Sequence, residues 1–143
     1  GVGIAGQIWS GSSKGSNNFE LFPPKLSRQD PDKKPELVAP AESVPVLIST
    51  NSGSNEPSQA TYGTASGTSA ATVYVSSAIA LMLQNNPEKS RNGSEGGTLD
   101  SVEIVKQWIK ESSQPSNNQN DHDEYYGYGI LQLDSLINRS NSA

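Results

Sequence analysis

The sequence predicts part of an α/β domain, in which helices pack on a sheet that this chain only partly supplies. Residues 69–85 carry apolar or small side chains on nearly every face, and a helix of this kind is buried on nearly every side. Residues 99–112 form a second, amphipathic helical pattern. Few segments have the composition of strands, so the layers that should surround the first helix are largely missing. We therefore expect the back half of an α/β domain rather than a whole one.

Length and charge set further limits. The chain has 143 residues, no cysteine and a net charge of −5, which corresponds to one domain at most, or a piece of one. No run of Lys and Arg suits a phosphate backbone, so nucleic acid is not an expected partner. The longest apolar stretch, Ala78–Leu83, is much shorter than the roughly 20 residues that cross a bilayer. The absence of cysteine excludes disulfides, thiolate metal sites and cysteine nucleophiles.

The first part of the chain alternates extended pieces and loops. Residues 2–9 mix β-branched residues with Gly and Ala and predict a short buried strand. Residues 10–33 are rich in polar residues and predict a long surface loop. Residues 36–49 contain two prolines, which limit them to short extended pieces. Residues 1–49 thus hold strands and a long loop, and 50–62 are again loop.

The second part is helical. We expect the central serine-bearing helix at 69–85, ended by Asn85-Asn86-Pro87, and peripheral helices at 99–112 and 131–139. Either Asp100 with Glu103, or Thr98, is suited to cap the second helix. The apolar stripe of this helix comprises Val102, Val105, Trp108 and Ile109, and that of the last helix Leu133, Leu136 and Ile137. Gly127 and Gly129 predict a turn before the last helix.

Ser69 stands at the start of the central helix and has two interpretations. Serine is a common N-cap, because its hydroxyl accepts a hydrogen bond from a free N–H of the first turn. A cap alone does not require Gly67 before it and Ala70-Ala71 after it, whereas close approach of another molecule to the backbone does. A helix N-terminus also presents free N–H groups to a developing oxyanion, so Ser69 is equally placed to be a nucleophile in acyl transfer.

Four segments together resemble the subtilisin-like serine proteases (subtilases). The first, "SGTSAATVYVSSAIALML", is similar to the family's serine segment, in which Gly-Thr-Ser-x-Ala opens the central helix. The second, "KPELVAPAESV", is similar to the Lys-Pro-Asp-x-x-Ala-Pro-Gly stretch upstream of it. The others, "VKQWIKESS" and "YGYGILQLDSLI", are similar to the closing helix and the Gly-x-Gly turn with its final helix. They occur in the family's order and cover most of residues 34–138.

The resemblance implies a three-layer α/β subtilisin-like domain with a mostly parallel sheet, of which this chain holds only the C-terminal portion. It implies peptide-bond hydrolysis through an acyl-enzyme on Ser69, with Gly67, Thr68 and Ala70 supporting the helix N-terminus and the oxyanion site. Protein or peptide substrates and a secreted or cell-surface location also follow from the resemblance alone. The implied chemistry requires no cofactor.

The family's catalytic Asp, catalytic His and oxyanion Asn precede the matched segments. The sole histidine, His122, follows the second helix in a polar loop and is expected to be an exposed loop residue rather than the base. We therefore expect this polypeptide to be inert alone and to need an N-terminal portion of the same domain as its partner. No catalytic metal is expected. Residues 117–124 offer oxygen ligands for a structural calcium ion, although such clusters are more often solvated turns.

Several positions depart from the family pattern. Val73, Tyr74 and Ser77 stand where members usually carry Pro, His and Gly, and Ala41 replaces a Gly that matters if its φ is positive. These changes keep a second hypothesis open, in which the chain is a catalytically silent subtilase-like binding or scaffold module. A third alternative is a sedolisin-like acid serine peptidase, which pairs a similar serine with Glu and Asp.

Overall fold

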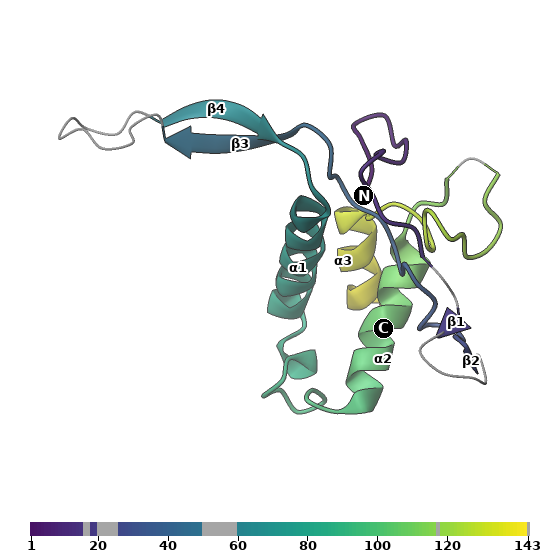
Figure 1. Cartoon of the computed structure of the whole chain (residues 1–143). Helices are drawn as coiled ribbons and strands as arrows, with labels where there is room; N and C mark the ends of the chain where they lie inside the picture. The colour runs from purple at the N-terminus through teal and green to yellow at the C-terminus, as the bar shows by residue number, and fades with distance from the viewer. Residues whose placement is uncertain (16–17, 20–25, 50–59, 117, 143) are drawn as a thin grey trace.

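The computed structural model describes residues 1–15, 18–19, 26–49, 60–116 and 118–142, and everything below refers to these. Three helices lie side by side, and a hairpin projects away from them (Figure 1). In chain order the elements are β1 (Asn18–Phe19), β2 (Leu26–Ser27), β3 (Val44–Ser49), β4 (Ala60–Ala65), α1 (Thr68–Asn85), the short 3₁₀ helix η1 (Pro87–Lys89), α2 (Leu99–Ser112) and α3 (Leu133–Asn141).

The sheets of the described residues are two antiparallel hairpins. β1 pairs with β2, and β3 pairs with β4 in a register that runs from Val44 opposite Ala65 to Ser49 opposite Ala60. The mostly parallel sheet that the family resemblance implied is not seen in these residues, where parallel pairing is limited to single bridges. These bridges join Val2 to Pro40 and Val38 to Ile130. The chain brings one short extended piece to each bridge, and a parallel sheet needs several strands of greater length joined by crossovers.

The strand expected at residues 2–9 is wrong, because this segment folds back on itself. The N–H of Gly3 donates to the carbonyl of Gln7 over 2.9 Å, and Gly6 has a φ of 78° that favours glycine. Val2 consequently bridges Ile8 in an antiparallel sense and is buried, whereas Ile4 is fully exposed. The turn at Gly6 therefore outweighs the β propensity of the β-branched residues around it.

Residues 36–49 contain a short extended piece, as expected, whereas the loop expected at 50–62 needs correction. β3 is six residues long although it contains Pro45, and Ala60–Tyr62 belong to β4 rather than to a loop. Proline lacks an N–H, which costs little in a two-stranded hairpin because each strand keeps one unpaired edge. Residues 50–59 of the expected loop lie outside the described residues.

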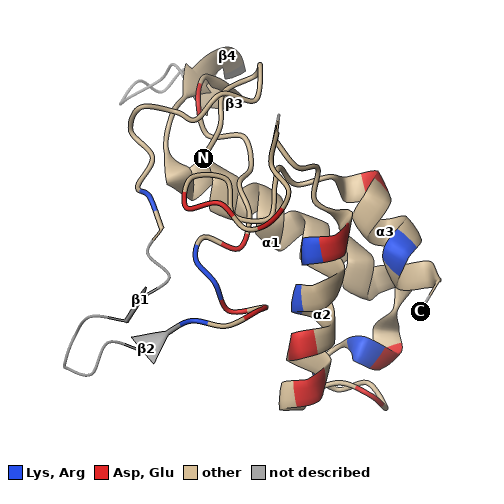
Figure 2. Ribbon diagram, turned by 90° about the vertical axis from the view of Figure 1, so that its right-hand side faces the viewer, with Lys and Arg blue, Asp and Glu red and all other residues tan. Residues whose placement is uncertain are grey.

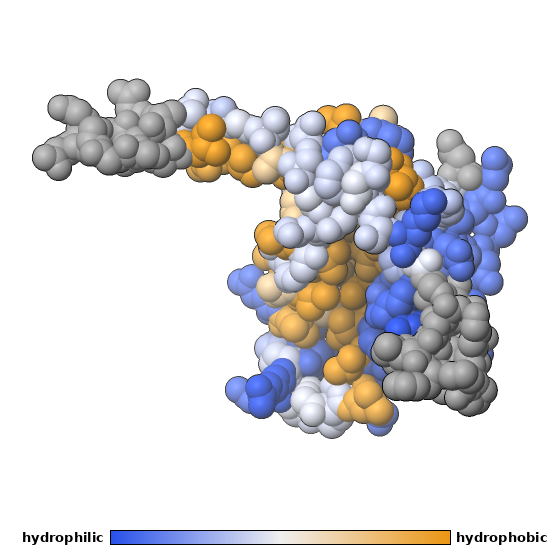
Figure 3. Space-filling view, in the orientation of Figure 1, coloured by the Kyte–Doolittle hydropathy of each residue, from blue (hydrophilic) through white to orange (hydrophobic). Residues whose placement is uncertain are grey.

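The core lies between the three helices. α3 contacts both α1 and α2, and the buried cluster consists of Ala78, Met82, Trp108, Ile109 and Leu136. The expectation that α1 is buried on nearly every side is wrong, because the side chains of Val73 and Leu81 are 64% and 45% exposed. Figure 3 shows apolar side chains over the helices on one face of the molecule. No described layer covers that side of α1, although its residues are those of a buried helix.

α2 occupies Leu99–Ser112, against an expected 99–112, and α3 occupies Leu133–Asn141, against an expected 131–139. Of the two proposed caps for α2, Thr98 is the cap that forms: its hydroxyl accepts from the N–H of Ser101, whose own hydroxyl accepts from the N–H of Thr98. This reciprocal pair is a capping box with Ser in the place of Glu. None of the helices described is both long and apolar enough to cross a membrane.

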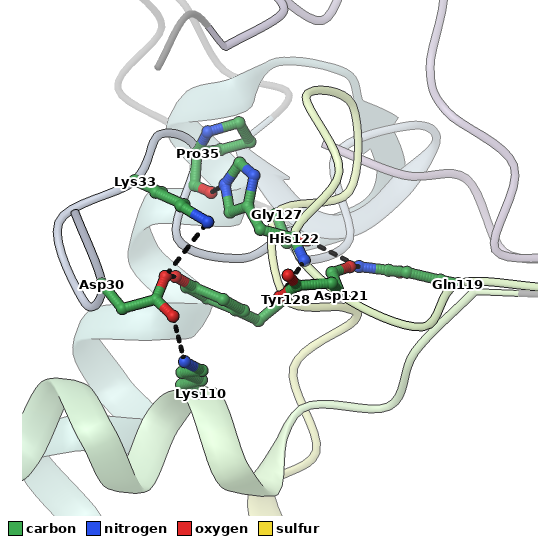
Figure 4. A network of polar contacts seen from close by, with 9 residues as sticks. All are labelled: Asp30, Lys33, Pro35, Lys110, Gln119, Asp121, His122, Gly127 and Tyr128. Atoms are coloured by element: carbon green, nitrogen blue, oxygen red, sulfur yellow. Dashed lines mark hydrogen bonds and ion pairs between the residues drawn. The ribbon is translucent and has the colours of Figure 1, made fainter. Parts of the chain in front are cut away.

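Charged residues of α2 fasten the helix to the loop that precedes residue 36 (Figure 2). Lys110 donates to Asp30 over 2.8 Å, and Lys106 contacts Asp32. Asp30 also accepts from the hydroxyl of Tyr128, whose ring lies 4.5 Å beneath the Lys110 ammonium (Figure 4). Three distant segments of the chain therefore meet at one carboxylate.

His122 belongs to the same cluster and is not the exposed loop residue that was expected. It is half-buried, its Nε2 lies 2.9 Å from the carbonyl oxygen of Pro35, and its ring packs edge-on against Tyr128 at 5.0 Å between centroids (Figure 4). Gly127 and Gly129 adopt φ values of 64° and 138°, which confirms the predicted turn. The turn brings Tyr128 under the loop that contains Pro35.

Asp30 is expected to make stability depend on pH. The hydrogen bond from Lys110, and then that from Tyr128, lower the pKa of Asp30 from 3.8 to about 2. The folded state thus favours the charged carboxylate, and this contribution is present above pH 3.8 and lost as the pH falls toward about 2. In urea titrations, Asp30→Asn should lower the free energy of unfolding at pH 6, and its difference from the wild type should shrink between pH 4 and pH 2.

Glu124→Gln, at an exposed position of the 118–126 loop, is the matched control and should leave the pH dependence unchanged. An Asp30→Asn variant with the wild-type slope over this range would contradict the assignment.

Candidate active site

An extended segment, Val38–Ala41, supports the site, and all of its residues except Pro40 are buried. Ala39 and Ala41 are 0% exposed. The N–H of Val2 donates to the carbonyl of Ala39 over 3.0 Å, and the N–H of Ala41 donates to the carbonyl of Val2 over 2.8 Å. On the other side, Val38 exchanges backbone bonds with Gly129 and Leu131. The segment is therefore held from both sides before the hairpin begins.

The junction between β4 and α1 is tied to this segment by two hydrogen bonds. The N–H of Gly67 donates to the carbonyl of Ala41 over 2.7 Å, and the N–H of Ser43 donates to the hydroxyl of Ser66 over 2.9 Å. The positive φ in this region falls at Ser43, with 53°, and not at Ala41. The replacement of the family's Gly by Ala41 therefore imposes no strain on the backbone.

Ser69 is not the cap of α1. The helix begins at Thr68, its N-cap is Gly67, and no side chain makes a capping hydrogen bond. Ser69 is the second helical residue and its side chain is exposed. The cap interpretation of Ser69 is thus wrong, and its exposed hydroxyl is accessible to a molecule that approaches the helix end.

The amides of the helix end divide into two groups. Those of Gly67 and Ala70 are engaged, with Ala70 donating to the carbonyl of Gly67 over 3.0 Å. No backbone acceptor is found within the described ranges for the N–H of Thr68 or Ser69. The first turn of α1 also carries no acidic residue that would offset the positive end of the helix. The end of α1 can therefore stabilise negative charge beside Ser69.

The exposed apolar side of α1 includes Ser69. Residues four apart share one face of a helix, so Ser69, Val73, Ser77 and Leu81 form a row along it. A separate cavity of about 580 Å³ is lined by Tyr74 of α1 and by residues of the turn at 2–6 and of the segment 42–45. Ser69 does not line that cavity, and its side chain is exposed at the N-terminal end of α1.

The loop proposed for calcium uses its carboxylates locally. Asp121 accepts from the N–H of His122, and Asp123 accepts from the N–H groups of Tyr125 and Tyr126 over 2.8 and 2.9 Å. Among the residues that the structure describes, no three His, Cys, Asp or Glu side chains converge as a metal site. Asn117 lies outside the described residues. Calcium binding at this loop stays a prediction.

Comparison with known proteins identifies the family. The profile of the Subtilase family (peptidase S8) matches residues 3–129. The chain belongs to the subtilase family. The resemblance drawn from the serine segment and its neighbours is thereby confirmed, and Ser69 lies within the matched range.

The solved structures that match this subtilase include the crystal structure of fervidolysin from Fervidobacterium pennivorans, a keratinolytic enzyme related to subtilisin. The match has a TM-score of 0.51 at 23% sequence identity and covers 69% of this chain. It covers 14% of fervidolysin, so the chain corresponds to a small part of that protein. No curated protein matches the chain at a significant level.

Ser66 belongs to the site through its hydroxyl, and the sequence pattern did not indicate this role. Its hydrogen bond to Ser43 joins positions 23 residues apart. A single serine in a Ser-rich chain carries no signal of such a contact. The positive φ of Ser43 accompanies this hydrogen bond. The sequence does not indicate it either, because Ser is not a residue that favours a positive φ.

The surroundings of Gly67 predict the result of a substitution. Gly67 has extended backbone angles, and a Cβ there would meet no atom closer than the amide nitrogen of Ser69 at 3.9 Å. A Cβ on Gly127, by contrast, would lie 2.5 Å from the backbone of Glu36, at a φ of 64°. Gly67→Ala should therefore change the free energy of unfolding by less than about 1 kcal/mol, and Gly127→Ala should lower it by about 2 kcal/mol or more. Chemical denaturation of both variants tests this contrast, and equal losses would contradict it.

Proposed function

We propose that this subtilase is the serine-bearing portion of an endopeptidase that hydrolyses peptide bonds through an acyl-enzyme on Ser69. The observation that carries the proposal is the exposed hydroxyl at the second residue of α1. It lies beside a helix end without an acidic side chain, where the amides of Thr68 and Ser69 have no backbone acceptor in the part of the chain that the structure describes. Membership of the subtilase family supports the same reaction class.

The chemistry requires three steps from the groups around Ser69. Its oxygen attacks the carbonyl carbon of the peptide bond, while a base removes the hydroxyl proton. The carbonyl oxygen becomes an oxyanion, which the N–H of Ser69 and the helix end stabilise. The base returns the proton to the leaving amine, and water then releases the acyl group.

The base, its orienting carboxylate and a second oxyanion donor must come from another portion of the domain. His122 is occupied by Pro35 and Tyr128 in the structural cluster of the C-terminal loop. The partner that we propose is the N-terminal portion of the same peptidase domain. The exposed row of Val73, Ser77 and Leu81 supports this partner, because it gives α1 an apolar side that ends at Ser69.

Protein or peptide substrates and a secreted or cell-surface location belong to the same proposal. Both the substrate class and the location are inferred from membership of the family and not from a contact in this chain. The acyl transfer that we describe uses side chains and backbone amides alone, so it needs no cofactor. A calcium ion in the loop at 117–124 would act on stability rather than in the reaction.

A catalytically silent module is the competing function. Tyr74, where the family usually has His, lines the cavity beside the helix and gives that hypothesis its physical basis. A fluorophosphonate probe separates the two functions, because it forms a covalent bond with an activated serine only.

Labelling should be measured on the protein that contains the N-terminal portion, and mapped by mass spectrometry. We expect one labelled residue, Ser69, no labelling of Ser69→Ala, and at least about 10³-fold slower labelling of the chain 1–143 alone, because it lacks the base. Absence of labelling in the folded complete protein would favour the silent module.

The docking surface gives a second prediction. Val73→Asp places a charge on the row that we assign to the N-terminal portion, and burial of an unpaired charge is costly. When the two portions are mixed as separate chains, this variant should reduce reconstituted labelling at least about tenfold. Leu99→Asp, at an exposed apolar position of α2, is the control and should reconstitute normally. Loss in both variants or in neither would contradict docking on the α1 row.

A further inference from the structure

The junction before Ser69 has an anchor with no part in the chemistry described above. Ser66 follows β4 directly, and its hydroxyl accepts the N–H of Ser43 over 2.9 Å. One residue later, the N–H of Gly67 donates to the carbonyl of Ala41 over 2.7 Å. The two bonds run between the same pair of segments, and α1 begins at the next residue, Thr68.

The two bonds differ in what holds their partners. Ala41 is fully buried, and it is fixed by its own bond to Val2. Ser43 and Ser66 are exposed, and Ser43 has a left-handed φ of 53°. That conformation costs free energy for a residue other than Gly or Asn. The hydrogen bond to Ser66 offsets part of this cost, because the Ser66 hydroxyl accepts the N–H of Ser43.

We infer that Ser66 is a positioning residue for Ser69. Through Ser43 and Ala41, the pair of hydrogen bonds fixes the path of residues 66–67 and hence where the second residue of α1 presents its oxygen. Loss of the hydroxyl leaves the bond between Gly67 and Ala41 as the remaining tie, around which the junction can rotate. Ser66 itself touches no reacting atom. The inference rests on the proposed function, since it concerns the rate at which Ser69 reacts.

The test uses the complete protein and a fluorophosphonate probe at several concentrations, which separates the limiting labelling rate from the half-saturating concentration. Ser66→Ala should lower the limiting rate about tenfold, because small displacements of a nucleophile are costly in rate, and leave the half-saturating concentration within about twofold. Ser66→Thr keeps an acceptor oxygen and should restore the rate. Thr64→Ala, at an exposed position of β4, is the matched control and should label as the wild type does.

Each outcome decides a different statement. If the wild type labels and Ser66→Ala labels equally fast, the positioning role is overturned and the proposed function stands. A slower Ser66→Ala rate that Thr cannot restore, with a lower melting temperature, assigns Ser66 to stability and also overturns the role. A complete wild-type protein that does not label overturns the proposed function and the positioning role together.

Discussion

The structure depends on the burial of one extended segment, Val38–Ala41. Its backbone accepts or donates hydrogen bonds to the turn after Val2, to the C-terminal turn around Gly129, and to the helix junction at Gly67. Ala39 and Ala41 have no exposed surface, so these bonds are shielded from water and costly to break. Three parts of the chain that are distant in sequence are thereby held in one arrangement. The position of Ser69 is a consequence of this segment rather than of α1 alone.

The central helix shows how composition can describe a larger assembly than the chain that carries it. Its residues fit burial on all sides, but α3 covers one side, and Val73 and Leu81 on another side remain exposed. The same helix therefore carries the serine that we propose as the nucleophile at its end, and exposed apolar side chains along its length. Because both lie on one face, a partner that covers the surface also reaches the serine.

Much of the helical part could be predicted from the sequence, because its signals are local. The span 99–112 follows from an apolar stripe, the end of α1 at Asn85 from Asn-Asn-Pro, and the turn at Gly127 from two glycines. The position of Ser69 at a helix end was predicted in the same way. Whether it caps the helix was not, because the choice depends on Gly67 taking the cap position.

Two of the errors have their physical origin in contacts with residues or layers that are distant in the sequence. His122 is held by Pro35, 87 positions away, and no local pattern indicates this contact. Which side of α1 is exposed depends on the elements that pack beside the helix, and the apolar pattern of the helix does not predict which elements these are. The turn at 2–9 is a local error: the left-handed φ of Gly6 is incompatible with a continuous strand, and β propensity is a weak and context-dependent preference.

The projecting β3–β4 hairpin has a consequence for handling the chain in isolation. Leu47 and Tyr62 are paired across the strands and exposed, and within the described ranges each strand bonds with the other alone. Unpaired strand edges with apolar side chains are templates for association with other chains. The segment 1–143 produced by itself would accordingly be prone to aggregate through this arm, and its solubility would report on how well the arm is shielded.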